Sequence, residues 1–186
     1  MARGLERWYL QPVRMADLVS DSGALRFRLR LVGREGSPRG AVPPEGGDGL
    51  TPAGRLLAAA SLDYLDRRDG EHWPLVELAA LRLPPEAARS LAGGLADLVR
   101  GAAPGLAWQS GDPAALGLQA SAPGDAPGEP WLVEVGMDLS GFLADAAGTP
   151  ARPGVELALF RFPAGRAALV AFASALESEL GELLGG

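Results

Sequence analysis

The sequence predicts an α+β fold built from two similar units, each with about four mainly antiparallel strands followed by a helix. The phrase "PLVELAALRLP" at 74–84 returns as "PGVELALFRFP" at 153–163, with seven identical positions. A helical pattern follows each copy. Because each unit alone would leave one sheet face bare, we expect the two to pack as a single domain. This internal duplication divides the chain into about 5–103 and 104–186.

The strands are predicted from alternation of apolar and polar residues, which is typical of a half-buried strand. Each repeated phrase alternates in this way, with one shift of phase where a β-bulge would fit. Two weaker matches pair 23–31 with 114–120 and 55–65 with 131–143, and these four segments are also expected strands. Trp8 and Trp108 each lie on the expected first strand of a unit.

Two helices are expected, at about 84–101 and 164–184, each after the Pro that closes a repeated phrase. A Pro ends a strand and is tolerated at the first helical position. Apolar residues recur at helical spacing in both segments. They are Ala87, Leu91, Leu95, Leu98 and Val99 in the first helix, and Leu169, Phe172, Leu176, Leu180 and Leu183 in the second. Gly101 looks like a C-terminal stop, and the Gly93-Gly94 pair weakens the first helix.

Composition excludes several classes of site. The 186 residues contain no Cys, which removes disulfides, thiolate nucleophiles and Cys-based metal sites. They contain no Lys, Ile or Asn either, a bias typical of a GC-rich bacterial genome. The net charge is −6, with a basic segment at 1–56 and an acidic one at 57–186. No apolar run approaches the length of a membrane span, so we expect a cytoplasmic protein.

The segment "LRFRLRL" places Leu25 and its alternate neighbours on one face and three arginines on the other. Guanidinium groups in a row can bind carboxylates or phosphates. We therefore predict a partner-binding surface. Its residues are Arg26, Arg28, Arg30 and Arg34. The competing interpretation is a half-exposed strand whose arginines pair with acids such as Asp63 and Glu77 on neighbouring strands.

Catalytic chemistry has little support in the sequence, and we expect neither an enzyme nor a cofactor. His72 is the only histidine. It could join Asp66, Asp69 and Glu71 around a divalent cation, although a solvated hairpin tip turning at Asp69-Gly70 explains this segment better. Glu77 and Glu156 occupy equivalent repeat positions, where solvent-facing strand residues are again the simpler explanation.

Two families have a similar order of secondary-structure elements. The segments "LAWQSGDPAALGLQ", "WLVEVGMDLSGFL", "VELALFRF" and "LVAFASALESEL" resemble small bacterial immunity proteins of the WapI type, in which a strand meander precedes a helix. The repeated order of four strands and a helix is similar to the Whirly fold, whose members bind single-stranded nucleic acid. The first resemblance implies a protein partner, and the second implies a nucleic-acid ligand.

Three functions follow as expectations. The first is a non-enzymatic protein-binding module, such as an immunity, accessory or assembly factor, that recognises its partner electrostatically. The second is a single-stranded nucleic-acid-binding domain using the arginine-bearing strand, although the acidic composition makes this ligand the weaker expectation. The third is an enzyme centred on His72. Exposed edge strands would also allow a homodimer, and the Gly/Pro-rich loop at 33–54 is long enough to have a function.

Overall fold

The computed structural model describes residues 16–34, 54–66, 68–111, 115–121, 129–138 and 157–185. Eight strands and two helices follow one another in the order ββββα-ββββα. The first sheet, sheet A, has β1 (Ala16–Val19), β2 (Leu25–Arg34), β3 (Leu56–Leu65) and β4 (His72–Leu83), followed by α1 (Pro85–Arg100). The second, sheet B, has β5 (Gly105–Gln109), β6 (Leu116–Ser121), β7 (Trp131–Asp138) and β8 (Leu157–Ala164), followed by α2 (Arg166–Leu184).

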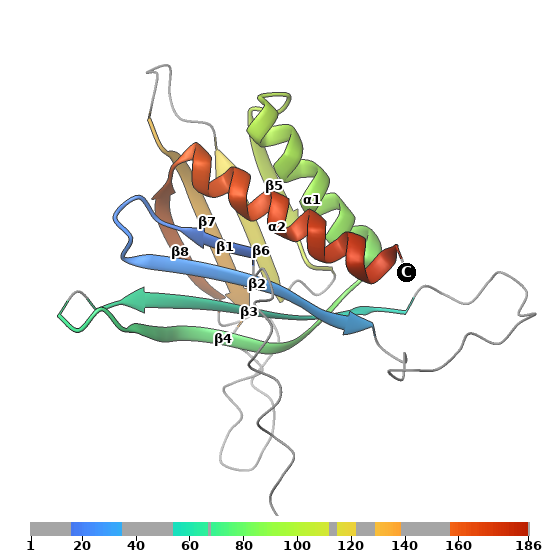
Figure 1. Ribbon diagram of the computed structural model, residues 1–186, viewed down its shortest axis with the longest axis horizontal. Helices are drawn as coiled ribbons and strands as arrows, with labels where there is room; N and C mark the ends of the chain where they lie inside the picture. Colours follow the sequence, from blue (N-terminus) through green and yellow to red (C-terminus); the bar gives the residue numbers. More distant parts are fainter. Residues whose placement is uncertain are drawn as a thin grey trace, which may run out of the picture.

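The two units have the same topology. In each sheet every strand pairs antiparallel with its neighbour in the sequence, as Figure 1 shows. Equivalent positions of the repeat occupy equivalent places: Leu83 and Phe162 are both buried, and so are Leu62 and Met137. The predicted α+β fold class is therefore confirmed, and both helices begin and end within two residues of the expected bounds.

The second repeated phrase departs from the first at its closing Pro. Strand β4 ends at Leu83 before the Pro, as predicted, whereas β8 continues past Pro163 to Ala164. Pro163 lies opposite Leu132 on an edge strand, where a residue without an N–H costs no ladder hydrogen bond. The prediction that this Pro ends the strand was wrong for the second unit.

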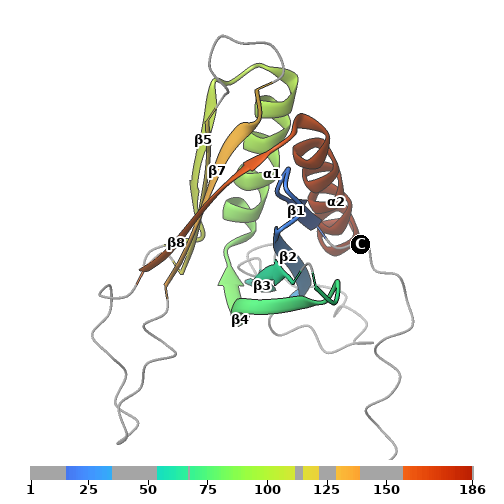
Figure 2. The same ribbon diagram turned by 90° about the vertical axis from the view of Figure 1, so that its left-hand side faces the viewer.

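The helices are exchanged between the two units. Helix α2 packs against β1 and β2 of the first unit, while α1 packs against β5 of the second. Figure 2 shows both helices in the angle between the two sheets. Specific contacts fix the exchange: the Phe27 and Phe172 ring centroids are 5.9 Å apart, and the Trp108 indole N–H donates to the Ala87 carbonyl at 2.8 Å. One continuous core results.

Bulges change which side chains face this core. In β2 the register shifts between Leu31 and Gly33. In β4 it shifts twice, near Pro74 and again between Leu78 and Leu81, which are both buried. A shift of this kind moves the following residues to the opposite face. The phase shift predicted in the first repeated phrase is thus confirmed as a β-bulge.

Sequence reasoning missed β1, which is only four residues long. Its Ala16 and Leu18 are fully buried, while Asp17 and Val19 face outward. Such a short alternation is difficult to distinguish from a loop. Trp8, predicted to lie on the first strand, lies outside the described residues, as does most of the 33–54 loop.

Candidate partner-binding surface

Three of the four predicted arginines lie on the outer face of sheet A, away from the helices. Arg26 lies opposite Asp63 on β3. The Asp63 carboxylate accepts hydrogen bonds from both Arg26, at 3.2 Å, and Arg28. The Asp63 side chain is only 4% exposed because the two guanidinium groups cover it. The competing interpretation, arginines paired with a neighbouring strand, is therefore correct for Arg26 and Arg28.

The other two arginines are exposed but lie on different faces. Arg30 is opposite Ala59, on the same outer face as Arg26. Arg34 follows the bulge and lies opposite Leu56, whose side chain is fully buried in the core. Since opposite residues of an antiparallel pair point to the same side, Arg34 is on the helix side of the sheet. The four predicted arginines therefore do not form one surface: three lie on the outer face of sheet A, and Arg34 lies on the helix side.

A fourth charge, Asp17, completes the cluster around Asp63. Asp17 lies opposite Arg28 on β1. Burial raises the pKa of its carboxyl above the usual value, while Arg26, Arg28 and His72 lower that pKa and Asp63 raises it. Two carboxylates therefore face two guanidinium groups. This balance leaves little net charge at Arg26 and Arg28 to attract a phosphate chain.

The helix-side face of sheet A carries an exposed apolar row at its hairpin end. The cross-strand register aligns Leu25, Tyr64 and Trp73. Tyr64 is 43% exposed and Trp73 is 54% exposed, whereas Phe27 and Leu62 in the next row are buried. Figure 1 shows this β3–β4 hairpin extending beyond the helices, which explains why its row has no cover. We call Leu25, Tyr64 and Trp73 the hairpin shelf.

The turn that joins β3 to β4 is held by its own side chains. The Asp66 carboxylate accepts from the Arg68 N–H and the Asp69 carboxylate from the Glu71 N–H, each at 2.9 Å. Gly70 has φ +74°, which favours glycine. The hairpin turn predicted here is confirmed. Within the described part of the chain, no cluster of three or more His, Asp or Glu residues is arranged to hold a metal ion.

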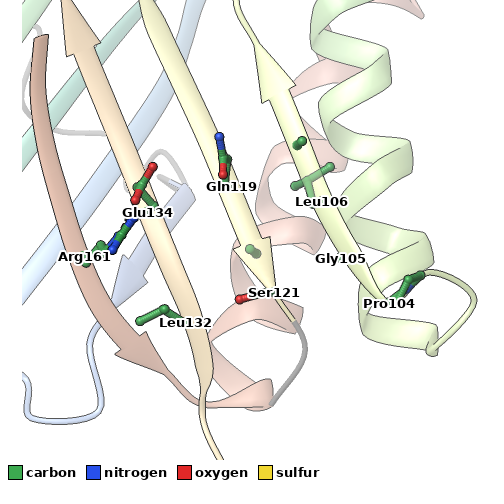
Figure 3. Close-up of a pocket in the computed structure, with 10 residues that line it drawn as sticks. Pro104, Gly105, Leu106, Gln119, Ser121, Leu132, Glu134 and Arg161 are labelled. Carbon is green, nitrogen blue, oxygen red and sulfur yellow. Dashed lines mark hydrogen bonds and ion pairs between the residues drawn. The ribbon is translucent and has the colours of Figure 1, made fainter. Parts of the chain in front are cut away.

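The outer face of sheet B contains a shallow hollow of about 490 Å³, shown in Figure 3. Its lining comes from all four strands and the residue before β5, and includes Gln119, Leu132, Glu134 and Arg161. Arg161 forms an ion pair with Glu134 across neighbouring strands. These polar groups satisfy each other, and the lining contains no histidine to act as a base. The predicted alternative partner of Glu77, Glu156, lies outside the described residues.

Sequence reasoning named the arginines and missed the hairpin shelf. One signal was available: Tyr64 and Trp73 flank the Asp69-Gly70 turn, so a hairpin there brings them close together. Alternation alone would have placed both rings on a core face. Only the relative lengths of the hairpin and the covering helices show that the rings are exposed.

Comparisons with known proteins show no family. No family model matches the chain, and no curated protein matches it either. One solved structure with a similar fold is that of the plant transcriptional regulator PBF-2. It has 10% identity and a TM-score of 0.47, over 87% of this chain and 78% of the other. A likeness at this level carries no conclusion on function, and none of the comparisons shows similarity to WapI-type immunity proteins.

In the described ranges, neither helix combines the length and the apolar composition needed to cross a bilayer.

Proposed function

We propose that the chain is a non-enzymatic protein-binding module that docks its partner on the hairpin shelf. The observation that carries this proposal is the exposed cross-strand pair Tyr64–Trp73. Tryptophan and tyrosine contribute most often to binding hot spots, because they bury a large apolar area and lose little conformational freedom. A pair of such rings on two hydrogen-bonded strands is already ordered before binding.

The shelf also suits a protein partner better than a nucleic acid. Bases stack on aromatic rings while cations contact the backbone beside them. Here the rings lie on the helix side of sheet A, whereas Arg26, Arg28 and Arg30 lie on the outer side. One single strand could not use both sets at once. The net charge of −6 favours a partner with a basic surface around an apolar pocket.

The test compares one double-site change with one single-site change, both at exposed apolar positions. Protein purified from the native host should retain a discrete partner with wild type and with Leu159→Ser, a control on β8 that is 56% exposed. The Tyr64→Ser/Trp73→Ser variant should lose the partner. With the identified partner, calorimetry should show affinity at least 30-fold weaker for the double variant, as expected for hot-spot residues.

Two results would contradict the proposal. The first is unchanged affinity of the folded double variant, with folding checked by circular dichroism. The second is co-purifying nucleic acid, seen as excess absorbance at 260 nm, whose binding is lost in Arg30→Ala and weakens with salt. That result would favour the nucleic-acid alternative in place of protein recognition.

A further inference from the structure

The outer edge of β4 is the longest strand edge in the described part of the chain. Strand β4 has twelve residues and, among the described strands, pairs only with β3. The other edges are shorter or covered. Strand β1 has four residues and packs beside α2, β5 has five residues and packs on α1, and β8 has eight residues with Pro163 near its end. Long exposed edges are templates for pairing with another strand.

The bulge in β4 gives this edge an unusual symmetry. In a regular strand, residues five positions apart face opposite sides of the sheet. The register shift between Leu78 and Leu81 instead puts Glu77 and Arg82 on the same, outer face: Glu77 lies opposite Ser61 and Arg82 opposite Leu57. Leu78 and Leu81 share the core face. The 77–82 segment is therefore balanced about this bulge, with an acid on one side and a base on the other, while a second register shift of β4, near Pro74, lies outside that segment.

We propose that two copies of this chain pair antiparallel along β4, related by a two-fold axis at the bulge. In this register Glu77 of each copy faces Arg82 of the second copy, and Leu78 faces Leu81. Both pairs have matching faces, so the two sheets join as one sheet without moving an apolar residue to the solvent side. Opposite charges placed directly across two strands favour this register over its neighbours.

The pairing leaves the hairpin shelf accessible. Trp73 lies ten residues before Leu83 on β4, so the two hairpins of a dimer project at opposite ends of the joined sheet. The dimer does not depend on the proposed function, and it would present two shelves to a partner. Tyr64→Ser on β3 should therefore leave dimerisation unchanged while it weakens partner binding.

A charge exchange tests the interface. Light scattering over a range of concentrations should give a mass that approaches twice the 19.2 kDa of one chain. Glu77→Arg and Arg82→Glu should each raise the dimer dissociation constant at least 10-fold, through like charges across the strands. The double variant Glu77→Arg/Arg82→Glu should restore it. A wild type that stays monomeric at every concentration, or single variants that dimerise normally, would overturn the proposal.

A disulfide test determines the register directly. Because the chain has no native cysteine, only the introduced cysteines can form a disulfide. Residues directly opposite in an antiparallel pair have Cα atoms about 4.5–5.5 Å apart, within the range of a disulfide. A mixture of Glu77→Cys and Arg82→Cys chains should form a heterodimeric disulfide under mild oxidation. Each variant alone should form much less of the disulfide, because the single cysteines of its two copies are then five positions out of register. Equal cross-linking in all three samples would reject the register.

Discussion

At the residue scale, Glu179 is the clearest departure from a simple apolar helix face. This carboxylate of α2 is 5% exposed, and its Oε2 accepts from the Leu31 N–H at 2.8 Å. Strand β1 begins at Ala16, which lies opposite Leu29, two residues before Leu31 on β2. The Glu179 side chain satisfies the Leu31 N–H, a buried donor that would be costly to leave unpaired. Burial raises the pKa of Glu179, and backbone N–H groups and Arg30 only partly offset this.

This raised pKa predicts a pH-dependent stability. The folded state binds the Glu179 proton more tightly than the unfolded state, whose ordinary value is 4.5. The stabilising contribution of protonation is complete below that value and is lost as pH rises through the folded pKa. Urea unfolding should therefore show wild type gaining stability relative to Glu179→Gln as pH falls from 7 toward 4.5.

The matched control is Glu177→Gln, an exposed position on the same helix, which should show no such trend relative to wild type. Glu179→Leu removes the acceptor entirely and should cost about 1–3 kcal/mol by leaving the Leu31 N–H unpaired. A constant difference between wild type and Glu179→Gln across this pH range would contradict the assignment.

At the element scale, the two adjacent glycines of α1 have different structural roles. The two positions differ in what a side chain would meet. A Cβ on Gly93 would contact nothing within 4 Å, whereas one on Gly94 would lie 2.5 Å from the Leu106 Cδ1 on β5. Gly94 therefore permits the close approach of α1 to the second sheet, and Gly93 has no such role. The sequence predicts that both glycines weaken the helix, and that prediction concerns helix propensity only. It does not include the packing contact at Gly94.

The two glycines should respond oppositely to the same change. Gly93→Ala should stabilise the protein by about 1 kcal/mol, the usual difference in helix propensity. Gly94→Ala gains the same propensity but must displace Leu106, so we expect it to be neutral or destabilising. Thermal unfolding of the two variants decides the matter. Equal stabilisation by both would show that the contact between α1 and β5 is looser than described.

At the scale of the whole molecule, the exchanged helices make the two units interdependent. Each helix follows its own sheet in sequence but packs on a sheet of the other unit. Two polar contacts add to this. The Asp21 N–H donates to the Pro163 carbonyl at 2.9 Å, and the Arg166 guanidinium donates to the Val99 carbonyl at the end of α1 at 2.7 Å. The latter also places a positive charge where the helix dipole favours it.

Separated halves should therefore fail to fold. Fragments 1–103 and 104–186, expressed apart, should show no cooperative thermal transition, because each leaves an apolar sheet face uncovered. Mixed after unfolding, they should recover the far-UV circular dichroism and the transition of the intact chain. A fragment 104–186 that folds cooperatively alone would contradict a single domain and favour two autonomous ones.

The sequence by itself determined the repeat, both helices with their apolar stripes, and every described strand except β1, because these depend on local periodicity and on capping residues such as Gly101. It also located the arginine row on β2. It offered the pairing of Asp63 with Arg26 and Arg28 only as one of two interpretations, since that pairing depends on the register between β2 and β3, and the bonded residues are 37 and 35 positions apart in the sequence. The exposure of Tyr64 and Trp73, the change of face at Arg34 and the burial of Glu179 were decided only by the tertiary structure. Each depends on where a bulge falls or how far a neighbouring element extends, and neither is specified by the pattern of the residues concerned.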